Sequence, residues 1–412
     1  MKLVCILRSI LFVCVTFIIF ASCSDDIITY SRRGIEDGPA TLSNRIDRNN
    51  EFAFKLYAEL KASDDNLIIS PHSIATCFGM AYAGARGDTE KQIADILCFN
   101  YPQQGFHAIL ETLNEDLTSR ADIDLRIANG SWGQDGSHYE QAYLDTLSEC
   151  YGAAIEYLDF AGDPEGSRDT INNWVKDNTA GYIDELLPSD CLDGNTYLVL
   201  ANTVYFMAEW LHQFKPEYTY PGSFTRLDDS QVTAQLMHGE QKMPYFVGDG
   251  FAAMAMPYKG EQVSMVLILP DEGQYSAFED AFSAAGFDTV VANLVETYIT
   301  FTIPKFGFYS YFDLGESLYD MGIVDAFTPG VADFSGMDGT AEDGMPWIDL
   351  VVHKAYIMID EYGTMAFAGT AMELSLGIHP SFDALRPFIY VIVDNPTGTI
   401  LFMGRVLDPT AE

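Results

Sequence analysis

The chain has 412 residues, of which 48% are hydrophobic and 20% are charged, a balance typical of a globular protein and not of a disordered one. Lys and Arg number 22 against 60 Asp and Glu, which gives a formal net charge of −38. So strong a negative charge argues against nucleic acid or an anionic membrane surface as a partner. A heavily solvated acidic surface is one interpretation of the charge, and attraction to cationic partners is the other.

The first residues are typical of a secretory signal. A short basic region with Lys2 and Arg8 precedes a nearly continuous apolar run over residues 9–20, which is short for a membrane-spanning helix. We therefore predict that residues 1–22 are a signal peptide.

The end of this signal, Phe-Ala-Ser-Cys, resembles a bacterial lipobox, in which the Cys is acylated and becomes the mature N-terminus. The resemblance implies lipidation of Cys23, followed by a polar tether over residues 23–44. The Ser-Asp-Asp that follows Cys23 resembles a tag for the outer cell surface. We expect a secreted or cell-surface lipoprotein, on the outer-membrane or extracellular side of a bacterium. An ordinary cleaved signal with an incidental Cys is the alternative.

Helical and strand patterns mix from residue 49 onward without regular βαβ alternation. Helices are predicted over residues 49–61, 73–85 and 169–179. Strands are predicted over residues 197–206, 263–269 and 351–359, with a hairpin formed by 388–393 and 399–403. No Gly-, Ser- or Pro-rich linker divides residues 45–412, so we expect one large α+β domain there.

The cysteines of this domain suggest no covalent framework. None forms a C-x-x-C pair, and their spacings suggest neither disulfides nor a zinc site, so burial among apolar side chains is the expectation for Cys77, Cys98, Cys150 and Cys191. No metal or cofactor is expected.

No local signature of an enzyme is present. The sequence lacks a G-x-S-x-G elbow, an H-E-x-x-H helix, a phosphate loop and a G-x-G-x-x-G turn. Among the seven histidines, His353 shares one face of its predicted strand with Ala355 and Ile357, and it is interpreted as a buried, hydrogen-bonded core residue. A catalytic triad assembled from distant positions leaves no local motif, so a hydrolase stays an alternative.

Residues 360–380 form an unusual connection between two predicted strands. A solvated loop is normally polar, yet this one has no charge over residues 362–372 and no proline before Pro380. In an extended conformation Thr364, Ala366, Ala368 and Thr370 fall on one face, and all four are small. Such a face can enter a packed sheet without overfilling it, and Gly363 supplies a hinge.

Nine stretches, in order, resemble the serpin family across residues 45–410. They are N-L-I-I-S-P-H-S-I at 66–74, A-G-A-R-G-D-T at 83–89, I-N-N-W-V-K-D-N-T-A-G-Y-I at 171–183, A-N-T-V-Y-F-M-A-E-W at 201–210, I-P-K-F at 303–306, G-I-V-D-A-F at 322–327, A-D-F-S-G-M at 332–337, V-V-H-K-A at 351–355 and F-M-G-R-V at 402–406. The resemblance implies a large central, mostly antiparallel sheet with surrounding helices and an exposed reactive loop at about 361–383.

The resemblance also implies a protease inhibitor and not an enzyme. A protease attacks the loop as a substrate, and after cleavage at the acyl-enzyme stage the N-terminal part of the loop inserts into the central sheet. The covalently attached protease is dragged along and its catalytic geometry is broken. The implied partner is the target protease. We expect a monomer with no cofactor and no nucleic-acid partner, which meets a membrane only through its N-terminal lipid.

The resemblance implies two groups of functional residues. The first is a hinge at the start of the loop, made of Glu361, Gly363, Thr364, Ala366, Ala368 and Thr370. The second lies where the sheet opens, and comprises Ser70, Ser73, Asn202 and His353, with Trp210 near the point where the loop first enters. Plain core packing is the alternative for Trp210. Met365 and Phe367 depart from the family pattern of an acid and an alanine, so they either slow insertion or pack under a helix that crosses the sheet.

The bond that a protease would cut is predicted within one residue. The usual family spacing from Glu361 places the primary specificity residue at Gly377, before Ile378. A loop one residue shorter places it at Leu376, which we prefer. Leu suits a chymotrypsin- or elastase-like serine protease, or a papain-like cysteine protease, and Leu374 or Met372 would serve other proteases. A non-inhibitory member whose loop is cut without insertion is the alternative.

Overall fold

The computed structural model describes residues 42–99, 102–120, 122–339, 346–364 and 379–411. The predicted signal, Cys23 and the tether up to residue 41 lie outside the described residues, as do Met365, Ala366, Phe367, Ala368, Thr370, Leu376, Gly377 and Ile378. Within the described part of the chain, no helix combines the length and the apolar character that a membrane span needs.

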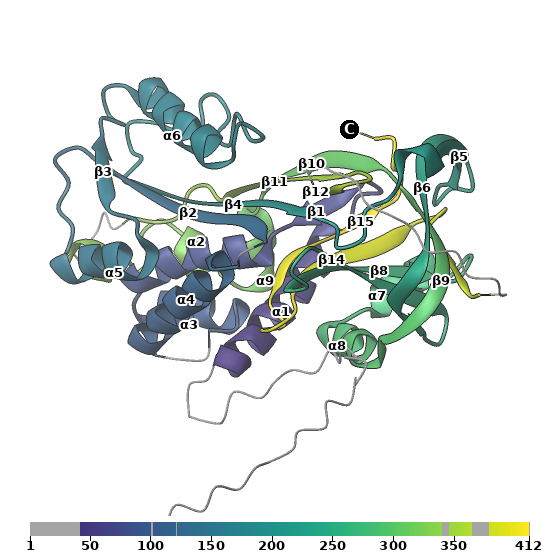
Figure 1. Cartoon of the computed structure of the whole chain (residues 1–412). Helices are drawn as coiled ribbons and strands as arrows, with labels where there is room; N and C mark the ends of the chain where they lie inside the picture. Colours follow the sequence, from purple (N-terminus) through teal and green to yellow (C-terminus); the bar gives the residue numbers. More distant parts are fainter. Residues whose placement is uncertain (1–41, 100–101, 121, 340–345, 365–378, 412) are drawn as a thin grey trace, which may run out of the picture.

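Helices and strands alternate irregularly along the chain (Figure 1). The α-helices are α1 (Leu42–Leu60), α2 (Pro71–Gly84), α3 (Gly87–Ile96), α4 (Gln103–Thr118), α5 (Gln141–Tyr151), α6 (Pro164–Asn178), α7 (Tyr275–Ala281), α8 (Ala284–Asn293), α9 (Gly315–Met321) and α10 (Ser335–Asp338). Short 3-10 turns lie at Pro216–Tyr218 and Asp325–Phe327. The strands are β1 (Leu67–Ile69), β2 (Ile123–Gln134), β3 (Ile155–Leu158), β4 (Leu198–Glu209), β5 (Thr219–Thr225), β6 (Gln231–Val247), β7 (Phe251–Pro257), β8 (Val263–Pro270), β9 (Val295–Pro304), β10 (Phe306–Asp313), β11 (Val352–Ile359), β12 (Gly363–Thr364), β13 (Ser381–Asp383), β14 (Phe388–Asp394) and β15 (Ile400–Val406).

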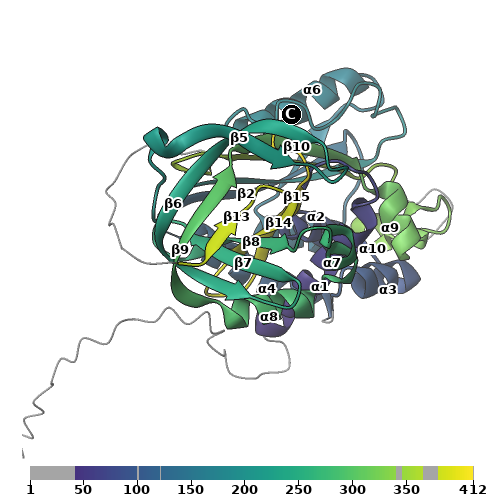
Figure 2. The ribbon, with the colours of Figure 1, turned by 90° about the vertical axis from the view of Figure 1, so that its right-hand side faces the viewer.

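Two sheets organise these strands. A six-stranded sheet has the order β10-β11-β12-β4-β2-β3, and a nine-stranded sheet has the order β1-β15-β14-β8-β7-β6-β9-β13, with β5 paired to β6. Figure 2 shows the curled side of the larger sheet, where β5, β6, β9, β7 and β8 lie together. The arrangement confirms the predicted α+β class.

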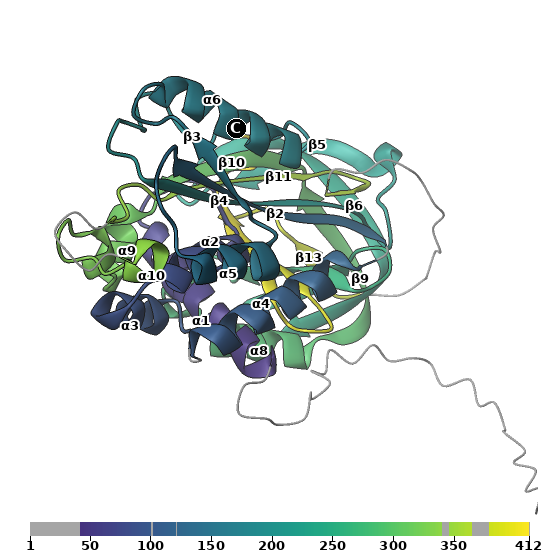
Figure 3. The ribbon, with the colours of Figure 1, turned by 90° about the vertical axis from the view of Figure 1, so that its left-hand side faces the viewer.

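The six-stranded sheet is covered on both faces. Helix α6 lies on one face, here called the outer face, and α2, α4 and α5 lie beyond the other (Figures 1 and 3). Ile171 and Val175 of α6 pack with Trp132 of β2 and Ala201 of β4 in one buried cluster. The inner face packs on β14 and β15, because Phe206 and Ile357 share a cluster with strand residues of that hairpin. A residue that enters this sheet therefore needs a small side chain on the inner face.

The predicted helices and strands are present, but several begin earlier than expected. Helix α2 begins at Pro71, where proline is favoured because its missing N–H has no partner in the first turn, and the Ser70 hydroxyl accepts a hydrogen bond from the Ser73 N–H (3.3 Å). Helix α6 likewise begins at Pro164, and its cap Asp163 accepts from the Gly166 N–H (3.0 Å). These caps extend both helices beyond the apolar pattern that predicted them.

The four cysteines are unpaired thiols, as expected, but only Cys98 is buried. Cys77, Cys150 and Cys191 are half-buried and pack against hydrophobic clusters, so the expected apolar burial is confirmed for these three only in part. Burial raises the pKa of all four thiols, because it withdraws the charged thiolate from water.

Candidate functional site

Gly363 and Thr364 already stand between two long strands of the six-stranded sheet. Thr364 pairs with Ile359 of β11 on one side and with Ala208 of β4 on the other, both antiparallel. In the part of the chain that the structure describes, β11 and β4 pair with β12 and not with each other. Two residues of the predicted hinge, Gly363 and Thr364, are therefore in the sheet, and the strands on either side are separated beyond them.

Glycine is required at position 363 by close approach to β4. A Cβ atom there would lie 2.1 Å from the carbonyl oxygen of Ala208, far inside van der Waals contact. Any other residue would push the start of the loop away from β4. The predicted hinge glycine thus has a clear physical role.

Thr364 points into the inner face, as the alternation of its segment predicts. Its side chain is 3% exposed, and its hydroxyl shares a 2.7 Å hydrogen bond with the hydroxyl of Tyr258. Tyr258 is fully buried, which raises its pKa, and its ring stacks on Trp210 at 4.5 Å between centroids. Sequence reasoning missed Tyr258, because nothing in its local sequence marks it as a partner of the loop.

Trp210 combines both of the roles weighed from the sequence. Its side chain is 2% exposed and belongs to the core cluster beneath the sheet. Its indole N–H also donates to the Asp360 carbonyl (3.0 Å), and its backbone N–H donates to the Tyr362 carbonyl (2.9 Å). The residue therefore packs in the core and holds the start of the loop.

Glu361, the first residue of the predicted hinge, anchors the chain just before β12. Its buried carboxylate accepts hydrogen bonds from Lys305 Nζ (2.7 Å) and from the Thr219 hydroxyl (2.8 Å), while its carbonyl accepts from the Phe214 N–H (2.8 Å). Burial raises the pKa of this carboxyl group, but the hydrogen bonds outweigh burial and leave the pKa lowered. No partner for Glu361 was predicted from the sequence, although Lys305 lies in the stretch I-P-K-F that carried part of the resemblance.

The four residues predicted where the sheet opens do come together. The Ser70 N–H donates to His353 Nε2 (3.1 Å), and the Ser73 hydroxyl donates to Asn202 Oδ1. Asn202 Nδ2 in turn donates to Asn129 Oδ1 (2.7 Å), a residue that the sequence reasoning did not select. The network joins α2 to β11, β4 and β2 beneath the separated strands.

His353 is a buried core residue, as expected from its place in the alternating strand. It is 6% exposed, and burial lowers its pKa to about 4. Ser70 meets this ring through its backbone N–H, whereas the Ser70 hydroxyl donates to the Leu401 carbonyl (2.8 Å). The pair is therefore not a nucleophile with its base. Among the described residues, no group of three or more His, Cys, Asp or Glu side chains is placed to hold a metal ion.

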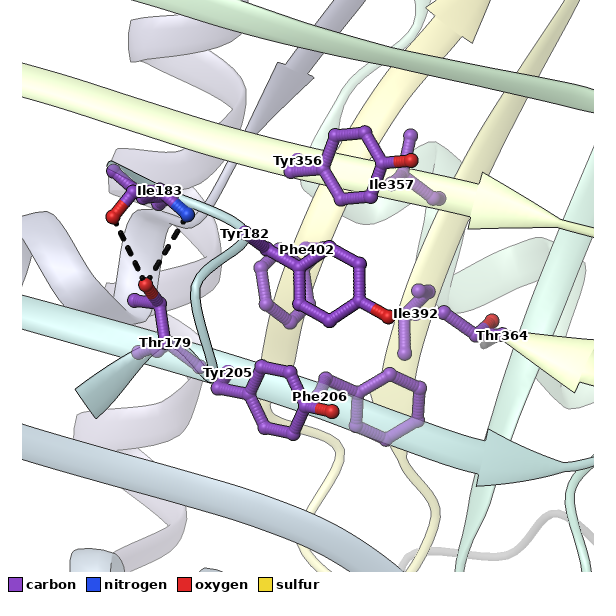
Figure 4. A pocket seen from close by; sticks show the side chains of 11 residues that line it. Thr179, Tyr182, Ile183, Tyr205, Phe206, Tyr356, Ile357, Thr364, Ile392 and Phe402 are labelled. Atoms are coloured by element: carbon purple, nitrogen blue, oxygen red, sulfur yellow. Dashed lines mark hydrogen bonds between the residues drawn. The ribbon is translucent and has the colours of Figure 1, made fainter. Parts of the chain in front are cut away.

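A small cavity of ≈ 20 Å³ continues from Thr364 between the separated strands, with room for about one water molecule. Figure 4 shows its walls: Phe206 of β4 and Ile357 of β11 flank it, and Phe402 and Ile392 of the β14–β15 hairpin lie at its floor. These four side chains are apolar, and the rest of the lining includes hydroxyl-bearing side chains, namely Thr179, Thr364, Tyr182, Tyr205 and Tyr356. The cavity therefore lies in line with β12, where a longer β12 would place its next inward side chain.

Comparison with known proteins decides the family. The model of the serpin family, described as serpin (serine protease inhibitor), matches residues 47–409. The chain belongs to the serpin family. This confirms the resemblance drawn from the nine ordered stretches.

Individual serpins match over nearly the same length. An uncharacterized serpin-like protein of Methanosarcina acetivorans is 34% identical over 381 residues, 88% of each chain. The leukocyte elastase inhibitor of Equus caballus is 32% identical over 376 residues, 88% of this serpin and 98% of that protein. The solved structure of human thyroxine-binding globulin complexed with thyroxine matches with a TM-score of 0.82 at 29% identity, covering 90% of this chain and all of that one (100%).

Proposed function

We propose that this serpin inhibits proteases by loop cleavage, covalent acyl-enzyme trapping and insertion of the loop into the six-stranded sheet. One observation carries the proposal: β12 occupies the space between β11 and β4 with only two residues, and both neighbours extend well beyond it. A strand that continued along them would pair on both sides.

The side chains that would follow Thr364 suit this path. Alternation places residues 366, 368 and 370 on the inner face with Thr364, and these are Ala, Ala and Thr. A longer β12 in the same register would bring residue 366 level with Phe206 and Ile357, which border the cavity, and residue 370 level with Asn202 and His353. On insertion a small residue would then meet these apolar side chains, and a hydroxyl would meet the polar network.

Chymotrypsin- or elastase-like serine proteases are the proposed targets, and papain-like cysteine proteases are a second class. Leu376 as the primary specificity residue supports this choice, and so does the likeness to a leukocyte elastase inhibitor. The cut bond would be Leu376–Gly377 or Gly377–Ile378.

Incubation with chymotrypsin, elastase and papain tests the proposal. We expect a complex that survives SDS, of the summed mass of protein and protease, and N-terminal sequencing of the released fragment locates the cut bond. Thr364→Arg is the matched variant, because a charge on the inner face beside Tyr258 would have to be buried. We expect this variant to be cleaved at a similar rate but to form at least about tenfold less complex, since the penalty of burying the charge exceeds 1.4 kcal/mol. Undiminished complex formation by Thr364→Arg would contradict insertion.

A non-inhibitory member is the second candidate. The bulky Met365 and Phe367 favour it, since they replace the usual acid and alanine of the family, and the likeness to a thyroxine-binding globulin adds support. In the same experiment this candidate gives clipped protein without any SDS-stable complex. Turnover of ester or peptide substrates by the purified protein would instead support the alternative that it is a hydrolase.

We further propose that the protein acts at a cell surface, held by a lipid on Cys23. The support is the apolar run of residues 9–20 and the Phe-Ala-Ser-Cys that ends it. Expressed in a bacterium, the full chain is expected in the membrane fraction and Cys23→Ser in the soluble fraction. An unchanged distribution, with no labelling by a fatty acid, would leave an ordinary secretory signal.

A further inference from the structure

Aromatic side chains cross the outer face of the six-stranded sheet at one level. Tyr309 of β10 stands opposite Tyr356 of β11, and Tyr205 of β4 stands opposite Arg126 of β2, whose guanidinium lies 5.3 Å from the Tyr205 ring centroid. Between Tyr356 and Tyr205 the row would be broken, because β11 and β4 are separated there. The break is filled by a residue that does not belong to the sheet.

That residue is Tyr182, from the segment that follows α6. Its ring stacks on Tyr356 at 5.5 Å with an angle of 19° between the planes, and lies 6.0 Å from Tyr205 at 30°. Figure 4 shows Tyr182 between these two rings, above the cavity that continues from Thr364. Tyr182 with its two neighbours, Tyr205 and Tyr356, is here called the tyrosine clasp, because it links two strands that share no hydrogen bonds with each other.

The segment that carries Tyr182 is attached to α6 and to β11. On the α6 side the Thr179 hydroxyl accepts from the Ile183 N–H (3.2 Å), and the Tyr182 N–H donates to the Thr179 carbonyl (3.0 Å). Asn172 of α6 accepts from the Leu186 and Leu187 N–H groups (2.9 Å each). On the other side Lys354 of β11 donates to the Glu185 carbonyl (3.0 Å). The ring of Tyr182 is therefore held over the separation by its backbone as well as by stacking.

The register of β12 predicts which residue of a longer strand would lie level with Tyr356 and Tyr205. Thr364 pairs with Ile359 and with Ala208, so three further residues of antiparallel strand bring residue 367 level with Tyr356 and Tyr205. Thr364 faces inward, so residue 367 would face outward, toward the ring of Tyr182. That residue is Phe367, one of the two bulky residues that depart from the family pattern.

We propose that Tyr182 holds, in the intact protein, the place that Phe367 takes on insertion. Withdrawal of Tyr182 is then a step that limits how fast the loop enters the sheet, and the Phe367 ring restores the stack between Tyr205 and Tyr356 afterwards. An alanine at residue 367 would leave the space between the Tyr205 and Tyr356 rings empty. The departure of Phe367 from the family pattern would therefore stabilise the inserted state. The inference rests on the proposed insertion mechanism and names the residue that controls its rate.

Peptide annealing tests the proposal without a target protease. A fluorescein-labelled peptide copying residues 363–374 is incubated with intact protein, and the rate of complex formation is followed on native gels. We expect Tyr182→Ala to take up the peptide about 2- to 10-fold faster than the unaltered protein, as loss of one stacked aromatic contact predicts. Tyr182→Phe keeps the ring and is expected to match the unaltered rate.

Tyr309→Ala is the matched control. Tyr309 belongs to the same row and is 58% exposed, but it stands on the edge strand β10, away from the separation between β11 and β4. We expect its rate of peptide uptake to equal that of the unaltered protein. Equal rates for Tyr182→Ala and the unaltered protein, or equal acceleration by Tyr309→Ala, would overturn the proposal.

A second peptide carrying Phe367→Ala makes the test independent of any protein variant. Its complex with the unaltered protein is expected to melt below the complex of the Phe-bearing peptide, and equal melting temperatures would overturn the exchange of Tyr182 for Phe367. If the proposed function itself is wrong, neither peptide anneals and cleavage of the loop leaves the melting temperature unchanged. That result would contradict both loop insertion and the role of Tyr182. If the peptides anneal but the rate is the same with and without the Tyr182 ring, only the role of Tyr182 is contradicted.

Discussion

At the scale of single residues, His353 is the clearest case of a side chain whose chemistry is set by the fold. The Ser70 N–H donates to its Nε2 atom, so the bond needs an unprotonated nitrogen there. Burial lowers the pKa of His353 to about 4 from its ordinary value of 6.5, because a charged ring would lose its hydration. Protonation would break the link between α2 and β11 in the network beneath the separated strands.

The stability of the intact protein should therefore fall in mild acid. Between pH 6.5 and 4 the unfolded chain binds a proton at His353 and the folded chain does not, so stability rises with pH across this window and is lost as pH falls through it. At pH 5 the loss relative to pH 7.5 is about 2 kcal/mol from this residue. Denaturant midpoints at pH 5 and pH 7.5 measure this loss of stability. His353→Gln is the comparison, because a Gln amide oxygen also accepts from the Ser70 N–H and does not titrate. The same pH dependence in both proteins would show that groups other than His353 govern the loss.

The residues of the hinge show how far local sequence reasoning reaches. The alternation of small residues placed Thr364 on the inner face, and the structure confirms this for the one member of the set that it describes. The partners of the hinge could not be predicted in the same way, because Tyr258, Lys305 and Thr219 are far from it in sequence. Only the pairing of β4, β6 and β9 with their neighbours brings them to one place.

At the scale of elements, segments with a strong apolar period were predicted correctly. Strands that form only through pairing with distant strands were not. Helices α1, α2 and α6 and strands β4, β8, β11, β14 and β15 follow from apolar patterns, with ends displaced where Ser70 and Asp163 cap the helices. Strand β6 was missed because Gly239 and Pro244 interrupt it, yet it runs for 17 residues. Its pairing with β9 over ten positions overrides the weak local preference.

The functional element, β12, has no sequence signal of its own. Two residues cannot show a strand period, and their extended conformation exists only because β11 and β4 stand apart around them. Resemblance to the serpin family supplied the expectation that the loop enters the sheet. The structure adds the register, and the register relates Phe367 to the tyrosine clasp, which no pattern in the sequence indicates.

At the scale of the whole molecule, the proposed insertion predicts that the intact fold is not the state of lowest free energy. Strand β4 pairs fully with β2 on one side, but in the described residues its other side pairs only at Ala208 and Glu209. Strand β11 is in the same position, with a complete ladder to β10 and one partner in β12. A longer strand between them would gain hydrogen bonds on both sides.

Cleavage of the loop should therefore make the protein more stable. Insertion of about ten residues forms on the order of ten backbone hydrogen bonds worth about 1 kcal/mol each, besides burying the small inner side chains, and ordering the loop offsets part of this. We expect a rise in Tm on the order of 10 °C or more after limited cleavage of the loop by a protease that the protein does not trap. Differential scanning calorimetry before and after cleavage measures the rise. Thr364→Arg is the control: a charge beside Tyr258 opposes entry of the strand, so the cleaved variant should melt near the temperature of its own uncut form. If cleaved and uncut protein melt together, the space between β11 and β4 stores no free energy, and cleavage could not disable a protease by drawing it across the sheet.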